Sequence, residues 1–100
     1  MVDLVRPRFR LGQTVATPAA LEAIQQAGQS PAEFLDRHVR GDWGNLSADD
    51  RALNDEAVQD GSRILSAYVT RAGEKIWVIT EATDDRGHRS ATTILLPDEY

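Results

Sequence analysis

The sequence predicts a small α+β protein in which three short N-terminal helices pack on a C-terminal three-stranded antiparallel β-meander. Residues 17–61 contain three sets of helix start and stop signals. Residues 63–96 are rich in β-branched and aromatic side chains and are divided by two turn signals, as expected of three strands. Because the helices come before the strands and do not alternate with them, a parallel α/β sheet is not expected.

Each predicted helix starts at a capping residue and ends before a glycine. The three spans are bounded by Thr17 and Gly28, by Ser30 and Gly41, and by Ser47 and Gly61. Ser30 and Glu33 have the spacing of a capping box. Before the first helix, Leu11–Thr17 is either a short strand or an extended lead-in. Residues 1–10 are expected to form a flexible basic arm, and residues 11–100 a single domain.

The register of the meander is predicted by counting outward from a turn at Ala72-Gly73. This count places Val69 opposite Ile76 and Tyr68 opposite Trp77. A second turn, near Arg86-Gly87, adds the third strand. Both faces of the resulting sheet are apolar, whereas a sheet with one face in water alternates apolar and polar residues. Three short helices can cover one face, so the other is expected to need the arm, the turn around Trp43 or another molecule.

The predicted aromatic face is therefore the main candidate for an interaction surface, with an intramolecular core as the alternative. Aromatic side chains concentrate binding energy at interfaces and stabilise cores alike. The candidate residues are Trp77, Tyr68, Ile64, Ile79, Ile94 and Trp43. A protein partner or a homodimer is expected to cover them.

The net charge of −5 is concentrated in the middle of the chain. Residues 1–16 carry +2, residues 17–62 carry −6 and residues 63–100 carry −1. Proteins that bind nucleic acid gain affinity by neutralising phosphates with Lys and Arg, so the acidic middle argues against nucleic-acid binding. What remains of that hypothesis is weak binding through Arg6, Arg8 and Arg10 of the arm.

The composition favours a cytoplasmic protein that does not enter a membrane. The chain has no cysteine, which excludes disulfides and Cys-based zinc sites. No apolar run approaches the ~20 residues of a membrane span, and Met1–Arg10 lacks the apolar core of a signal peptide.

No catalytic constellation is recognisable, so we expect a protein that is not an enzyme and uses no metal or cofactor. Nucleophilic catalysis requires an activated Ser, Thr or Cys beside an oriented base. In the predicted register Ser66 and Thr80 lie on opposite faces, and neither has a histidine beside it. The alternative is a small enzyme or ligand-binding domain with a pocket between the second helix and the sheet. Its polar residues would be His38, Asn54 and Glu81, which must then converge on one cavity.

Five segments carry a resemblance to a family of small bacterial proteins found on plasmids and integrative elements. They are Leu11–Pro18, Gly41–Gly44, Gly61–Tyr68, Ile76–Ala82 and Arg89–Pro97. Some members are labelled "type I restriction endonuclease subunit M". An adenine methyltransferase needs an Asn/Asp-Pro-Pro-aromatic motif, and this chain has no Pro-Pro. The resemblance therefore implies association with restriction or mobile-element genes and not catalysis.

These observations lead to one functional hypothesis. The chain is expected to be a non-catalytic mobile-element accessory protein that acts through protein–protein contact, with a link to restriction or host-defence systems. The loop Thr83–His88 is longer than in the proteins that the chain resembles. Function is therefore not placed in that loop.

Overall fold

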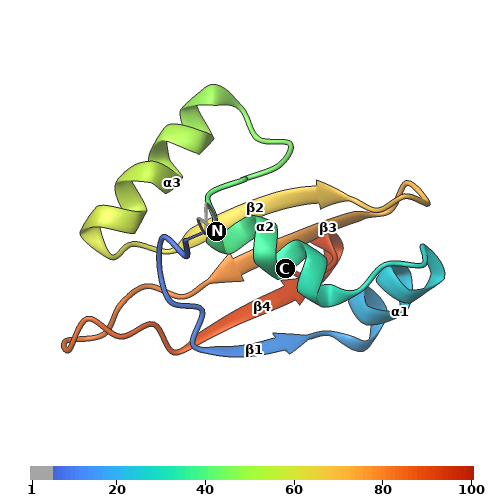
Figure 1. Ribbon diagram of the computed structural model, residues 1–100, viewed down its shortest axis with the longest axis horizontal. Coiled ribbons are helices and arrows are strands. Elements are labelled where there is room, and N and C mark those ends of the chain that lie inside the picture. The colour runs from blue at the N-terminus through green and yellow to red at the C-terminus, as the bar shows by residue number, and fades with distance from the viewer. Residues whose placement is uncertain (1–5) are drawn as a thin grey trace, which may run out of the picture.

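A computed structural model describes residues 6–100 and shows three helices packed on a four-stranded mixed sheet (Figure 1). The helices are α1 (Pro18–Gln26), α2 (Pro31–Val39) and α3 (Ala48–Asp60). The strands are β1 (Gln13–Ala16), β2 (Ile64–Val69), β3 (Lys75–Thr80) and β4 (Ala91–Leu95), followed by the 3-10 turn η1 (Pro97–Glu99). The predicted α+β class is confirmed.

The prediction of a purely antiparallel, three-stranded sheet is wrong, because β1 adds a fourth strand. The strand order is β1-β4-β3-β2, and β1 pairs with β4 in parallel. Of the two interpretations of Leu11–Thr17, the strand is therefore the one observed. Four residues carry too little alternation to predict a strand, and its partner β4 lies far away in the sequence.

Helix boundaries follow the predicted start and stop signals. Thr17 accepts a hydrogen bond from the backbone N–H of Ala20, and Ser47 caps α3 in the same way. The capping box predicted at Ser30 is absent, since its side chain makes no cap hydrogen bond. The Glu33 carboxylate accepts instead from the Gln29 side chain, through Oε2 at 2.7 Å.

The predicted register of the β2–β3 hairpin is wrong by one residue. Tyr68 pairs with Ile76 and Ala67 with Trp77. The turn contains three residues and not two, because Thr70 donates to the carbonyl of Glu74 and Gly73 closes the loop with a φ of 89°. A shift of one residue moves every side chain of β3 to the other face of the sheet.

All three helices pack on one side of the sheet, which we call the covered face. Its strand residues have even numbers and include Ile64, Ser66, Tyr68, Ile76, Val78, Thr80, Thr92 and Ile94, all of them buried. Ile24 of α1 and Phe34 of α2 join Tyr68 and Val78 in the main core. α3 lies beside β2 at the sheet edge, where Ala57 packs with Ile64 and Trp43 (Figure 1).

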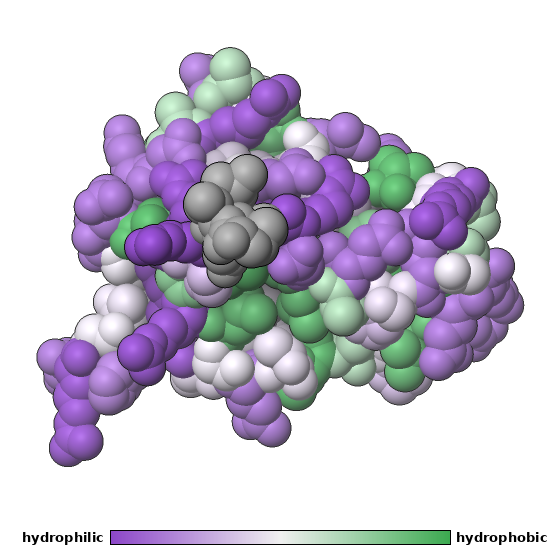
Figure 2. All heavy atoms as spheres, viewed as in Figure 1, coloured by the Kyte–Doolittle hydropathy of each residue, from purple (hydrophilic) through white to green (hydrophobic). Residues whose placement is uncertain are grey.

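Part of the predicted flexible arm contacts the domain. The Arg8 N–H donates to the carbonyl of Val39 at the end of α2, and the Phe9 ring stacks on Trp43 at 6.1 Å. The rest of the predicted arm, residues 1–5, lies outside the described residues. Seen from the helix side, the surface is mainly hydrophilic, with hydrophobic atoms scattered among the polar ones (Figure 2).

Candidate functional site

A buried chain of polar side chains crosses the covered face beneath α2. His38 contacts Ser66 Oγ of β2 through Nδ1 at 2.6 Å and Thr80 Oγ1 of β3 through Nε2 at 2.8 Å. Thr80 in turn contacts Thr92 of β4 at 2.7 Å, and Thr92 donates to the carbonyl of Leu11 at 2.7 Å. All four side chains are buried, so one helix and three strands are joined through internal hydrogen bonds.

The acceptor at the end of this chain fixes the tautomer of His38. The Leu11 carbonyl can only accept, so Thr92 uses its single proton there. Thr80 must then donate to Thr92, and His38 Nε2–H must donate to Thr80. Burial, followed by the charge of Arg89, lowers the pKa of His38 to about 3. The imidazole is therefore neutral at physiological pH, and its bare Nδ1 accepts from the Ser66 hydroxyl.

A serine hydrogen-bonded to a histidine is the pair that nucleophilic catalysis uses, but here the pair is enclosed. Ser66 and His38 are both 0% exposed. The rings of Phe9 and Trp43 pack on the imidazole with centroid distances of 5.2 and 5.9 Å. A substrate cannot reach Ser66 in this arrangement, and a histidine with so low a pKa is a weak base near neutral pH. The arrangement stabilises the fold and offers no route to acyl transfer.

Sequence reasoning missed this network because of the register of β3. With the predicted two-residue turn, Ser66 and Thr80 fall on opposite faces, whereas the structure places both against His38. The signal that could have found it is Gly73, since a glycine at the third loop position is typical of three-residue hairpin turns.

The other two predicted polar residues do not join His38. Asn54 is buried and hydrogen-bonds both backbone groups of Leu65, donating to its carbonyl at 2.7 Å and accepting from its N–H at 3.2 Å. The Glu81 side chain is exposed. Among residues 6–100 the three residues are therefore held by separate partners and are not brought to one cavity.

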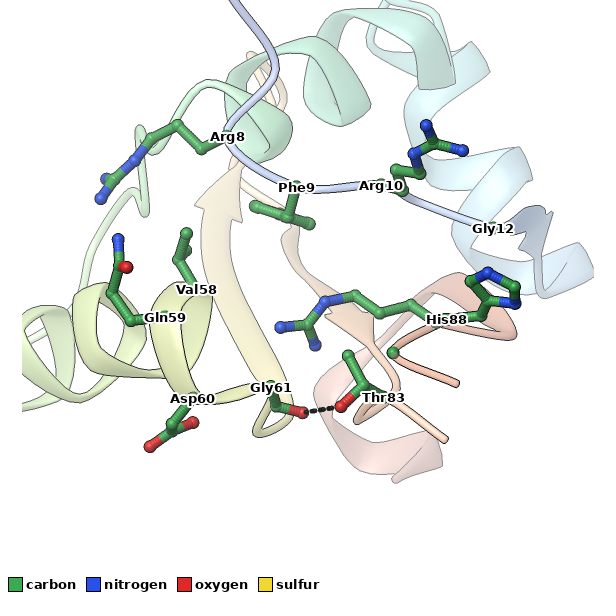
Figure 3. A pocket seen from close by; sticks show the side chains of 12 residues that line it. Arg8, Phe9, Arg10, Gly12, Val58, Gln59, Asp60, Gly61, Thr83 and His88 are labelled. Carbon is green, nitrogen blue, oxygen red and sulfur yellow. Dashed lines mark hydrogen bonds between the residues drawn. The ribbon is translucent and has the colours of Figure 1, made fainter. Parts of the chain in front are cut away.

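A cavity of about 670 Å³ lies between the arm, the end of α3 and the loop before β4, and three arginines are among the residues that line it (Figure 3). Arg89 is buried and donates to the carbonyls of Ala57, Ser62 and Glu81 at 2.8–2.9 Å. Burial lowers the pKa of this guanidinium. Because Ala57 lies in the last turn of α3, Arg89 satisfies a carbonyl at that helix end and ties it to β3.

The other two arginines of the cavity do not converge with Arg89. Arg8 forms an ion pair with Asp55 of α3 at 3.1 Å, and its guanidinium lies over the Trp43 ring. Arg8 and Arg10 extend away from each other, with Phe9 pointing between them (Figure 3). The cavity is thus lined by residues that attach the arm to the domain, and it does not present a common anion-binding point.

The six predicted interaction residues divide between the two sides of the sheet. Trp43, Ile64, Tyr68 and Ile94 are buried on the helix side. Trp77 and Ile79 lie on the opposite side, which we call the open face. Its residues are the odd-numbered ones of the strands, and the apolar or threonine side chains among them include Val15, Leu65, Ala67, Val69, Trp77, Ile79, Thr93 and Leu95. The buried side chains of the helices meet even-numbered strand residues, so they leave this face uncovered.

The open face is buried at its centre and exposed at its edges: Ile79 and Leu95 are 3% and 7% exposed, and Trp77 between them is half-buried. The Tyr100 ring meets Trp77 edge-on at 5.7 Å, and the Arg63 guanidinium lies 5.5 Å from the Tyr100 centroid. Val15 and Val69, which lie on the two outer strands of the sheet, are 43% and 42% exposed. The open face therefore has an aromatic centre and apolar flanks in contact with water.

Comparisons of the chain with protein families, curated proteins and solved structures found no match. Within residues 6–100, every helix is too short or too polar to cross a membrane.

Proposed function

We propose that this protein acts without catalysis, by binding another protein through the open face of its sheet. The observation that carries the proposal is a sheet face on which no helix packs, with a half-buried Trp77 near its centre and exposed Val15 and Val69 at its edges. Apolar patches of this kind mark contact sites on soluble proteins, and tryptophan is enriched among the residues that dominate binding energy.

The rim of the open face suggests the chemistry of the partner. Arg63 and Lys75 are exposed and lie at the starts of β2 and β3, on the side of Trp77. A partner that offers an apolar centre and carboxylates around it would complement this surface. From the family resemblance, we propose that the partner belongs to a restriction or host-defence system and that the chain is an accessory protein of a mobile element.

The small-molecule and nucleic-acid alternatives have less support. His38, Asn54 and Glu81 share no cavity, and Arg8 is paired with an acid of its own chain. A phosphate backbone would have to compete with that ion pair.

Site-specific crosslinking tests the proposal. A photoreactive residue is placed at Val69 on the open face or, as a matched control, at Leu53, which is 61% exposed on α3. In the native host, we expect a protein adduct from position 69 and none from position 53. A second substitution, Trp77→Ala, should abolish that adduct while circular dichroism confirms folding. Equal adducts from both positions, or an adduct that survives the loss of Trp77, would contradict the proposal.

A further inference from the structure

The two outer strands, β1 and β2, differ in whether the peptide groups on their outer edges are hydrogen-bonded. On β2 the outward peptide groups of Leu65 and Ala67 are occupied. Asn54 bonds the N–H and C=O of Leu65, while Ala67 donates to the carbonyl of Trp43 and accepts from the N–H of Asn45. Gly44 brings this segment close, since a Cβ there would lie 2.0 Å from the Ala67 carbonyl oxygen. This edge is closed to further strands.

Among residues 6–100, the outer edge of β1 has no hydrogen-bonding strand or segment beside it. The N–H groups of Gln13 and Thr17 donate to carbonyls of the β4 segment, at 3.0 and 2.9 Å. Because alternate residues of a strand direct their peptide groups to opposite sides, Thr14 and Ala16 point theirs away from β4. Within residues 6–100, the outward N–H and C=O groups of these two residues make no backbone hydrogen bond, and no element lies beyond β1 (Figure 1).

Apart from its length of four residues, β1 lacks the usual features that prevent edge pairing. Natural edges are very short, carry charges, prolines or bulges, or are covered. Gln13, Thr14, Val15 and Ala16 contain no charge and no proline, and their pairing with β4 is continuous. The side chains from Gln13 to Val15 are exposed. The same molecule therefore covers one edge with two segments, α3 and Trp43–Asn45, and leaves the β1 edge available to a strand.

We propose that β1 binds β1 of a second copy of this chain, antiparallel and about a two-fold axis. Pairing Thr14 with Ala16 of the other copy satisfies all the outward groups with four backbone hydrogen bonds. Val15 then lies at the axis, and the two Val15 side chains become neighbours on the open face. The product is one continuous eight-stranded sheet with both sets of helices on the same side.

Charge complementarity favours an antiparallel second copy as the occupant. Glu99 accepts a hydrogen bond from the Thr17 side chain at 2.7 Å, which places an acid at one end of β1. Arg10 lies beyond the other end and has no ion-pair partner among residues 6–100. An antiparallel arrangement brings the Glu99 end of each copy beside the Arg10 end of the other.

Edge pairing also explains how a small open face could bind a partner firmly; this step rests on the proposed function. Four strands of about five residues present a flat area of roughly 300 Å². A standard interface buries ~800 Å² on each side. Joining two copies through β1 doubles the open face and brings it close to that size.

Sedimentation velocity over a concentration series tests the inference. Thr14→Pro removes an N–H that β4 does not use, so it should weaken self-association about tenfold or more, through two lost hydrogen bonds in the dimer, while the monomer stays folded. Thr14→Val keeps the N–H and the branched side chain, and should associate like the wild type. A wild type that stays monomeric throughout, or equal association of the proline and valine variants, would overturn the inference.

Val69→Glu separates this inference from the proposed function. Val69 lies on β2, the strand farthest from β1, so this variant should keep the edge dimer and lose only the open-face contact. A dimer that Val69→Glu breaks and Thr14→Pro does not would show face-to-face pairing and overturn the edge inference. Amide exchange gives a second measurement, since the Thr14 and Ala16 N–H groups should become protected only as the concentration rises.

Discussion

The two faces of the same sheet differ in how the rest of the molecule covers them. On the covered face every strand residue from Ile64 to Tyr68 with an even number is buried, and its polar groups are hydrogen-bonded to one another. On the open face Val15 and Val69 remain about two-fifths exposed, although Ile79 and Leu95 nearer its centre are buried. The covered face therefore holds the main core, and the exposed edges of the open face are where the proposed contact would form.

This difference also explains where the most reactive-looking residues lie. His38 and Ser66 would suggest catalysis by composition alone, but they belong to the covered face, where their contacts exclude solvent. Among residues 6–100, the side chains of the open face nearest its centre are Trp77, Ile79, Thr93 and Leu95. The buried hydrogen-bond network therefore lies on one side of the sheet, and the surface proposed for binding lies on the other.

The largest difference between the faces is expected from Phe34→Ala. The Phe34 ring is fully buried between α2 and the covered face, where its centroid lies 5.6 Å from that of the Tyr68 ring. The substitution should lower the free energy of unfolding by about 3–5 kcal/mol, through lost burial and the cavity left behind. Leu53→Ala, at a position 61% exposed, should change it by less than ~0.5 kcal/mol. Urea denaturation measures both, and equal losses would contradict the comparison.

Acid should weaken the covered face through His38. The folded pKa is about 3, whereas an unfolded histidine titrates at its ordinary value of 6.5, so between these values only the unfolded chain binds the proton. Lowering the pH therefore favours unfolding, by up to ~1.4 kcal/mol per pH unit. Urea denaturation between pH 7 and pH 5 measures this slope above the range in which carboxylates titrate. His38→Gln should flatten it, and an unchanged slope would show that His38 is not its source.

Much of the fold was predictable from local signals, and the long-range pairing was not. The caps at Thr17 and Ser47 and the glycine stops fix the helices through neighbouring residues alone. The face of β3 depends on the loop that ends at Gly73, where one extra residue reverses the assignment of Trp77 and Ile79. The contact of His38 with Ser66 and Thr80 depends on that same register. The incorrect register therefore hid both the hydrogen-bond network and the division of the interaction residues between the two faces.

An exchange of threonine for valine at adjacent positions of β4 compares the faces directly. Thr92→Val removes a hydroxyl that joins Thr80 to the Leu11 carbonyl, and should cost about 1–3 kcal/mol because buried polar groups lose their partner. Thr93→Val, on the open face, removes no side-chain hydrogen bond present among residues 6–100 and should stay within ~0.5 kcal/mol. Thermal denaturation of the two variants measures the difference in their melting temperatures. Similar melting temperatures would mean that the network does not contribute to stability.

The smallest effect on stability is expected from the reverse exchange on the open face. Val69→Thr adds a hydroxyl at a position 42% exposed, where water can hydrate it, so the free energy of unfolding should change by less than ~0.5 kcal/mol. Val78→Thr makes the same chemical change on the covered face, where Val78 is 0% exposed, and should cost about 1–3 kcal/mol.

The same two variants should rank the other way round in the crosslinking assay, with the photoreactive residue moved to Thr93 on the open face. Val69→Thr should weaken partner capture because the contact surface becomes more polar, whereas Val78→Thr should leave capture intact in the folded fraction. If Val69→Thr captures the partner as well as the wild type does, the open face is not where the protein binds.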